Sequence, residues 1–210
     1  MKFTPGKRLL SSGRPMRLFT IAVVILTTFT MCARQTNHYK ITAPEAQLRV
    51  DFFLQEGKPY YTVVKDQQMV IDTSSLGYRF NDLPAMDKNF EVLEANTSSH
   101  EENWTQPWGE EKHITNHYNE LKVQLKNPAE DLRLNLYFRV FNDGVGFRYE
   151  IPRHEAFQKA EIIEEKTAFN FTGDHPSWWI PGDPDSYEYL YNETPLSKID
   201  SANTPVTFKR

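Results

Sequence analysis

Two histidines four residues apart lie in the stretch WGEEKHITNHYNE, which runs from Trp108 to Glu120. His113 and His117 have the spacing at which two imidazoles on one face of a helix share a metal ion. The zinc-protease form of this motif also needs a glutamate directly after the first histidine as general base, and Ile114 occupies that position. The two histidines can therefore hold a metal together only if the segment is helical.

The surrounding sequence predicts strands rather than helices. Apolar and polar residues alternate with a period of two in QLRVDFFL, YYTVVK, MVIDTSSLGYRF and ELKVQLK, which are separated by turn-forming stretches such as EGKP and KNPAED. Beyond the N-terminal region, no long apolar stripe has the helical period. In a strand, residues four apart lie on one face but about 13 Å from each other, so His113 and His117 are too far apart to share an ion.

The clearest strand pair is LRLNLYFRVFNDGVGFRYEI. The first strand directs five apolar residues to one side, and the second returns with four more: Leu132, Leu134, Leu136, Phe138 and Val140, then Val145, Phe147, Tyr149 and Ile151. Between them, Asp143-Gly144 predicts a tight hairpin turn in which the glycine takes a positive φ. These patterns predict an all-β fold, an antiparallel sandwich.

Length and charge limit the possible functions. A chain of 210 residues suits one domain and is too short for a sandwich plus a (β/α)₈ barrel, which alone takes about 250 residues. The net charge of -4 is spread along the chain without a basic cluster beyond the N-terminus, which argues against nucleic acid or an anionic surface as partner. Aromatic residues make up 13% of the chain, a composition that suits strands and also sugar-stacking surfaces.

The N-terminus predicts export. Five basic residues up to Arg17 precede an uncharged run, Leu18 to Met31, that is shorter than the roughly 20 residues of a membrane-spanning helix. We assign residues 1–32 to a secretory signal, with Met16 as an alternative start. Cys32 lies where a bacterial lipoprotein is acylated, although FTM is a poor lipobox, so membrane anchoring through Cys32 stays open. As the only cysteine it forms no intramolecular disulfide. The expected location is the periplasm or the outer membrane of a Gram-negative bacterium.

Three long motifs follow one another along the chain: QPWGEEKHITNHYNEL, then FRVFNDGVGFRYEIP, then GDHPSWWIPGD followed by YEY. Together they resemble the N-terminal domain of glycoside hydrolase family 97, the family of calcium-dependent α-glucosidases of starch-utilisation systems and of related α-galactosidases. The resemblance runs from about Ile41 to about Lys198. It implies a large antiparallel β-super-sandwich, similar to those of galactose mutarotases, that packs against a catalytic (β/α)₈ barrel.

We assign residues 39–210 to this domain and expect it to be incomplete. The chain stops at NTPVTFKR, in what reads as the opening of a strand, and the barrel is absent. Two classes of function remain open. The first is part of an exo-acting glycosidase that acts on oligosaccharides, and the second is a free-standing carbohydrate-binding sandwich or surface lipoprotein. The reading frame beyond Arg210 discriminates between them.

The resemblance also implies where the chemistry lies. Glycoside hydrolysis needs two carboxyl groups, and in this family both come from the barrel, so no residue of this chain is assigned a catalytic role. One glutamate of the N-terminal domain reaches a Ca²⁺ in the barrel's active site, and in WWIPGDPDSYEY this position is Glu188. Calcium takes six to eight oxygen ligands in flexible geometry, so a carboxylate from a neighbouring domain can complete its shell. Substrate-binding residues are left unassigned.

The segment around Glu188 has further candidates. Asp183 and Asp185 are possible additional calcium ligands, although aspartate before proline or serine commonly shapes turns. Trp178 and Trp179 face opposite sides of a strand, so at most one meets a pocket. The three alternating tyrosines share a face and are expected to pack in the core or at a domain interface: Tyr187, Tyr189 and Tyr191.

The residues of the opening stretch are expected to be structural. Trp108, after Pro107, is predicted to anchor its loop, and Glu110 and Glu111 with Lys112 are expected to form ion pairs at the surface or at an interface. His117 and Asn119 alternate into a strand, so both are candidates for the cleft where the sandwich meets the barrel.

Overall fold

The computed structural model describes residues 1–2, 38–155, 159–183, 185 and 188–199. The expected signal segment beyond Lys2, with Cys32, lies outside the described residues. The chain divides into two compact units, Met1–Gln35 and Thr36–Arg210, and the second forms the folded domain. Among the described residues, no helix has the length and apolarity needed to cross a membrane.

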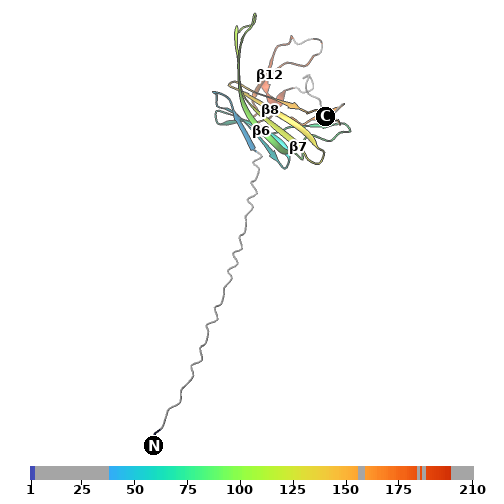
Figure 1. The fold of residues 1–210 in the computed structure, drawn as a ribbon. Coiled ribbons are helices and arrows are strands. Elements are labelled where there is room, and N and C mark those ends of the chain that lie inside the picture. Colours follow the sequence, from blue (N-terminus) through green and yellow to red (C-terminus); the bar gives the residue numbers. More distant parts are fainter. Residues whose placement is uncertain (3–37, 156–158, 184, 186–187, 200–210) are drawn as a thin grey trace. The chain divides into compact units, whose positions relative to one another are not determined.

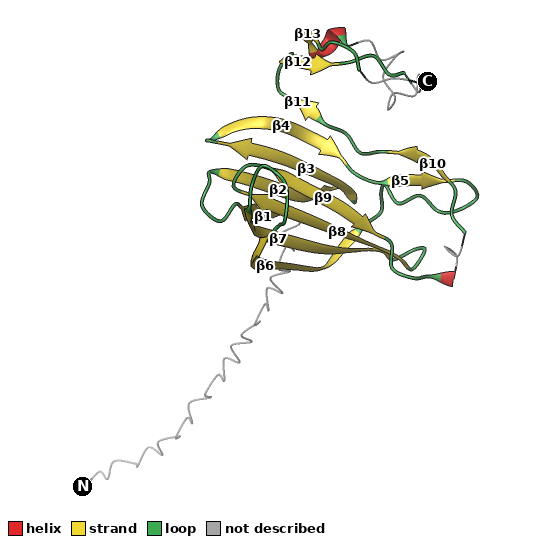
Figure 2. Cartoon of the chain, turned by 90° about the horizontal axis from the view of Figure 1, so that it is seen from above, coloured by secondary structure: helices red, strands yellow, loops and turns green. Residues whose placement is uncertain are grey.

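The domain is all-β, as the sequence predicts, and its strands pair antiparallel throughout the two larger sheets. One sheet has the order β1-β2-β3-β4-β11, the other β6-β7-β8-β9, and two small sheets pair β10 with β5 and β12 with β13 (Figure 2). The element bounds are β1 (His38–Thr42), β2 (Leu48–Gln55), β3 (Lys58–Lys65), β4 (Gln68–Ser75), β5 (Tyr78–Phe80), β6 (Glu91–Thr105), β7 (His113–Asn127), β8 (Leu132–Phe141), β9 (Val145–Glu150), β10 (Ile162–Glu165), β11 (Asn170–Phe171), β12 (Pro176–Trp179), β13 (Asn192–Pro195) and the 3₁₀ turn η2 (Leu196–Lys198).

The hydrophobic core lies between the two larger sheets. Phe138 on β8 is fully buried, and its ring centroid lies 5.9 Å from that of Phe52 on β2 and 6.1 Å from that of Tyr61 on β3. The five residues predicted to point inward from β8 are all at most 2% exposed: Leu132, Leu134, Leu136, Phe138 and Val140. The period-two alternation of this strand is thus confirmed for its core-facing side, although Asn135 and Tyr137 on the other side are also buried, at 7% and 8% exposure.

The predicted strand MVIDTSSLGYRF is two strands that belong to different sheets. β4 pairs with β3, β5 pairs with β10, and Gly77 lies between them with a φ of +133°. A Cβ atom at Gly77 would lie 2.4 Å from the carbonyl oxygen of Met86. The backbone at Gly77 passes so close to the backbone at Met86 that only glycine fits. The alternation of apolar and polar residues on either side of Gly77 does not reveal that the strand is interrupted there.

The β8–β9 hairpin forms where the sequence predicts it, but the prediction for its turn is wrong. Gly144 is not among the described glycines with positive φ. Instead, the amide of Phe141 donates to the carbonyl of Gly144 at 2.8 Å. The side-chain oxygen of Asn142 also accepts hydrogen bonds from the amides of Glu45 and Ala46, at 2.9 and 3.2 Å. The turn therefore reverses the chain and also contacts the loop between β1 and β2.

β6 and β7 form a hairpin that extends past the rest of its sheet. They pair from Glu91↔Lys126 to Thr105↔His113, whereas β7 pairs with β8 only from Tyr118 onward. The part from Glu101 to His117, here called the arm, is consequently two-stranded (Figure 1). His113 and His117 both lie on strand β7, which confirms that they do not form a metal pair on a helix.

Candidate functional sites

The loop between β12 and β13 presents Glu188 at the surface. β12 and β13 pair through Trp178↔Glu193 and Trp179↔Asn192, and the loop that joins them spans residues 180–191. Glu188 is exposed on this loop, and so are its neighbours Tyr189 and Leu190. The structure thus places the predicted calcium ligand on a surface loop rather than in the core.

Asp183 shapes this loop through both of its carboxylate oxygens. One oxygen accepts a hydrogen bond from the amide of Asp185 at 2.9 Å, and the other accepts one from the hydroxyl of Tyr189 at 2.5 Å. The bond to Asp183 is the main cause that raises the pKa of the Tyr189 hydroxyl above its usual value. This geometry matches the turn-forming interpretation of Asp183.

The described residues do not build a metal centre on their own. No group of three or more histidine, cysteine, aspartate or glutamate side chains with the geometry to hold a metal occurs in the part of the chain that the structure describes. Glu188 is an exposed carboxylate, the donor type that calcium prefers. It fits the role of one ligand in a shell that other residues must complete.

The two tryptophans of β12 face opposite sides, as predicted. Trp179 is half-buried and donates its indole N–H to the hydroxyl of Thr194 at 2.9 Å. Trp178 is 63% exposed. Tyr191 is 71% exposed and Tyr189 is 45% exposed, so core packing of these tyrosines is wrong, whereas Tyr187 lies outside the described residues. Three exposed residues with apolar surface, Tyr189, Leu190 and Tyr191, therefore follow Glu188 directly along the chain.

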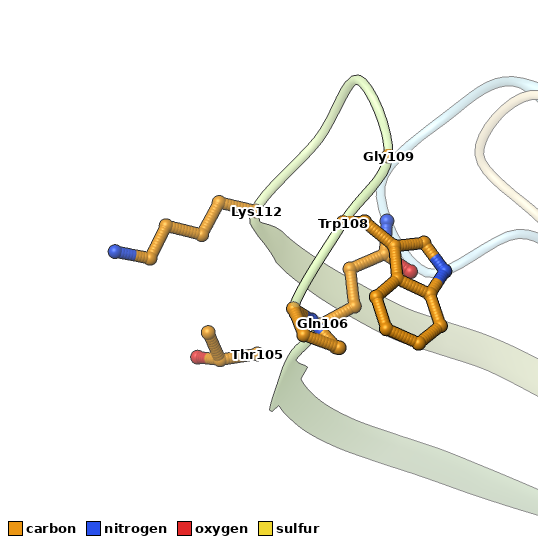
Figure 3. A pocket seen from close by; sticks show the side chains of 6 residues that line it. Thr105, Gln106, Trp108, Gly109 and Lys112 are labelled. Atoms are coloured by element: carbon orange, nitrogen blue, oxygen red, sulfur yellow. The ribbon is translucent and has the colours of Figure 1, made fainter.

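The loop at the tip of the arm is held by Gln106. The amide of Gln106 donates to the carbonyl of Lys112 at 3.1 Å, and its side-chain nitrogen donates to the carbonyl of Glu111 at 2.6 Å. Gly109 completes the reversal with a φ of +118°. Trp108 is 82% exposed, so the prediction that it anchors the loop is wrong. Hydrogen bonds of the glutamine fix the loop and leave the indole outside (Figure 3).

The other predictions for this stretch have mixed outcomes. Asn119 has a structural role, because its side-chain amide donates to the carbonyl of Thr42 on β1 at 2.9 Å. His117 is half-buried and lies opposite Glu101 on the arm. The expected ion pairs of Glu110 and Glu111 with Lys112 are not seen within the described part of the chain.

A row of charged and aromatic residues on the four-stranded sheet was not predicted. The register Lys122↔Tyr137↔Arg148 places the Arg148 guanidinium 3.8 Å from the Tyr137 ring centroid and the Lys122 ammonium 5.3 Å from it. Hydrogen bonding to Tyr137 is the main cause that lowers the pKa of Glu150. The row depends on the register of three strands, so no local sequence pattern indicates it.

Comparison with known proteins gives a consistent result. The family described as glycosyl-hydrolase 97 N-terminal matches residues 41–210. A variant of a glycoside hydrolase family 97 enzyme from Pseudoalteromonas sp. strain K8, solved with panose, is 29% identical with a TM-score of 0.70, over 76% of this chain and 25% of that chain. The enzyme from the same strain solved with acarbose is 30% identical with a TM-score of 0.69, over 75% and 24% of the two chains.

A crystal structure of a β-arabinopyranosidase has a TM-score of 0.60 at 24% identity, over 69% of this chain and 23% of that one, and shows likeness of fold alone. The chain therefore spans about a quarter of the length of the solved enzymes that it matches.

Proposed function

The chain belongs to glycoside hydrolase family 97 as an N-terminal domain, and from this we propose that it is part of an enzyme that releases terminal α-linked glucose or galactose from oligosaccharides. The observation that carries the proposal is the family match over residues 41–210. It is supported by the similarity to enzymes that were solved with panose and with acarbose, both of them oligosaccharides.

In this proposal the chain contributes structure and one metal ligand rather than catalytic groups. Hydrolysis needs one carboxyl group to protonate the leaving oxygen and a second to act as base or nucleophile. We place both on a (β/α)₈ barrel of the complete polypeptide. The 210-residue chain by itself is then expected to hydrolyse no aryl α-glycoside, and turnover above background by the pure chain would contradict this division of roles.

Glu188 is the residue that we propose for calcium. Its exposed carboxylate lies on the β12–β13 loop, and the segment from β12 to the end of this loop also carries the exposed apolar residues Trp178, Leu190 and Tyr191. Such a surface is suited to cover by another domain, and that domain would supply the remaining oxygen ligands. A bound calcium ion polarises groups in its site and orients the residues around it. Glu188 would thereby couple the two domains.

The test is Glu188→Gln in the complete polypeptide, assayed for hydrolysis across a calcium titration. The amide keeps the size of the side chain but removes its charge, so the half-activating calcium concentration should rise by roughly tenfold or more, with a lower maximal rate. Glu193→Gln is the matched control, since Glu193 is an exposed glutamate on the adjacent strand. If Glu188→Gln keeps the calcium dependence and the rate of the parent, the assignment is wrong.

We also propose export, with the periplasm or the outer membrane as the location. The basic N-terminus and the uncharged run that ends at Met31 support this. The mass of the protein recovered from its natural host distinguishes the alternatives. A cleaved product that carries lipid on Cys32 indicates membrane anchoring, and a cleaved product without lipid indicates a free periplasmic protein.

A further inference from the structure

The indole of Trp108 is largely exposed on a loop whose backbone is held by hydrogen bonds. Trp108 is 82% exposed, compared with 63% for Trp178 and 44% for Trp104. Its loop is nevertheless held at both ends by the hydrogen bonds of Gln106. A ligand that binds here would therefore not need to order the loop first, which removes one of the main free-energy costs of binding.

The tip is hollowed. A hollow of about 620 Å³ is lined by Thr105, Gln106, Pro107, Trp108, Gly109 and Lys112. Figure 3 shows the Trp108 ring on one side of the loop and the ammonium end of Lys112 extending on the other. On the side of Trp108 the lining offers one flat aromatic face next to the Gln106 side chain, whereas the side chains of Thr105 and Lys112 extend on the other side of the loop. A pyranose ring has matching chemistry, because one face carries C–H groups and its edge carries hydroxyls.

The charges near Trp108 argue against a protein interface. Glu110, Glu111 and Lys112 follow Trp108 within four positions, and all three are exposed. The cores of protein–protein interfaces are depleted of charged residues. A single aromatic platform in polar surroundings instead suits a small polar ligand with one apolar face.

We propose that the tip of the arm is a carbohydrate-binding site that takes an α-glucan chain, with one glucopyranose ring stacked on Trp108. This site lies on a different loop from Glu188 and adds a place where a long substrate is held at the surface. The choice of glucan rests on the proposed function, whereas the stacking on Trp108 does not. A single stacked ring gives weak binding, with a dissociation constant on the order of millimolar.

The test is native electrophoresis of the complete polypeptide through gels that contain soluble starch, with saturating acarbose to fill the catalytic pocket. The parent protein should be retarded, and Trp108→Ala should reduce the retardation by at least roughly threefold. Trp108→Tyr keeps an aromatic face and should keep most of the retardation. Trp104→Ala is the control, because Trp104 is exposed on the same arm outside the hollow, and it should migrate like the parent.

Three outcomes overturn the proposal: no retardation of the parent, unchanged retardation of Trp108→Ala, or an equal loss in Trp104→Ala. Hydrolysis of α-glucosides is measured on the same parent preparation. Retardation that depends on Trp108 without hydrolysis would mean that the proposed function fails alone. Hydrolysis without retardation would mean that the binding site at the tip fails alone.

Discussion

Individual side chains tie the later part of the chain to the core of the sandwich. The Tyr149 hydroxyl lies 2.7 Å from the hydroxyl of Thr167 and accepts a hydrogen bond from the amide of Gly77 at 3.2 Å. The Tyr61 hydroxyl donates to the carbonyl of Ala168 at 2.9 Å. The Tyr61 ring is buried, the Tyr149 ring is partly buried against the core, and both hydroxyl groups have hydrogen-bond partners, so the two tyrosines hold residues 167 and 168 against the core.

Burial of these two tyrosines predicts a loss of stability in alkali. Desolvation raises the pKa of Tyr61 to about 12 and raises that of Tyr149 as well. As the pH rises above about 10, the unfolded chain releases these protons before the native one does. The free energy of unfolding is therefore unaffected below about pH 10 and falls above it, by up to about 1.4 kcal/mol per pH unit for each tyrosine.

Urea unfolding at low protein concentration, followed by tryptophan fluorescence at about pH 8, 10 and 11, measures this effect. Tyr149→Phe should start from a lower stability, because it loses two hydrogen bonds, but decline less steeply with pH. Tyr191→Phe, at a position that is 71% exposed, should follow the parent. If the free energy of unfolding falls with pH equally steeply in Tyr149→Phe and in the parent, Tyr149 is not a cause of the loss of stability in alkali.

Gly77 is the residue at which the backbone tolerates least change. In Gly77→Ala the new methyl group meets the Met86 carbonyl oxygen at 2.4 Å and the Asp87 Cα at 2.8 Å, at a φ of +133°. Neither backbone atom can move cheaply, so we expect a loss of about 3 kcal/mol or more, seen as a lower soluble yield and melting temperature. Gly146→Ala is the matched control, because a Cβ there meets nothing within 4 Å. Equal soluble yields and melting temperatures of Gly77→Ala and Gly146→Ala would show that the close backbone approach at Gly77 does not make a substitution there destabilising.

At the scale of elements, the arm and the edge strand β6 are the parts with the least support. A two-stranded hairpin without further packing is only marginally stable in water. β6 also leaves one edge unpaired in the described sheet, and it carries Glu91, Glu94, Glu101 and Glu102 with a register shift between Val92 and Glu94. Charges and bulges of this kind discourage pairing with another strand. The arm can thus remain exposed without recruiting a second copy through its edge.

The arm should open more readily than the sheet to which it belongs. Residues 113–117 and 121–125 lie on the same strand, β7, but only the second group also pairs with β8. We expect hydrogen-bonded amides in the first group to exchange with solvent about a hundredfold faster or more. Hydrogen exchange followed by mass spectrometry or NMR measures this ratio, and residues 121–125 serve as the internal reference. Equal protection of the two groups would indicate that another surface holds the arm.

The sequence predicts best those elements that bury one face. β2, β3, β7 and β8 alternate visibly because their inner side chains form the core. β6 gives no such signal, since nearly all of its residues are exposed. The interruption between β4 and β5 at Gly77 depends on the close approach of the Met86 backbone. The exposure of Trp108 depends on an arm that extends beyond its sheet. Neither feature has a local sequence signal. The proposal of Glu188 as a calcium ligand rests on the family motif, because the spacing of acids in its loop does not separate a ligand from a turn residue.

At the scale of the whole domain, exposed apolar residues gather in the C-terminal part of the described chain. Strands β10 to β13 have two to four residues each, whereas the strands of the main core reach 15 residues. Between residues 162 and 191, the large apolar residues that are at least 45% exposed are Ile162, Ile163, Phe169, Phe171, Trp178, Tyr189, Leu190 and Tyr191. Such a concentration is typical of a surface that another part of a protein covers.

Residues 39–210, expressed alone, are therefore expected to self-associate. Leu190 and Tyr191 are 91% and 71% exposed, and in water their apolar surfaces favour contact between copies. Size-exclusion chromatography with light scattering over a wide range of concentration should show a mass that rises with concentration. Leu190→Ser combined with Tyr191→Ser should shift the rise to higher concentration, whereas Leu93→Ser, at an exposed position on β6, should not. A monomer at every concentration with a sharp cooperative melt would show that this surface needs no cover, and would remove the support it gives to domain packing around Glu188.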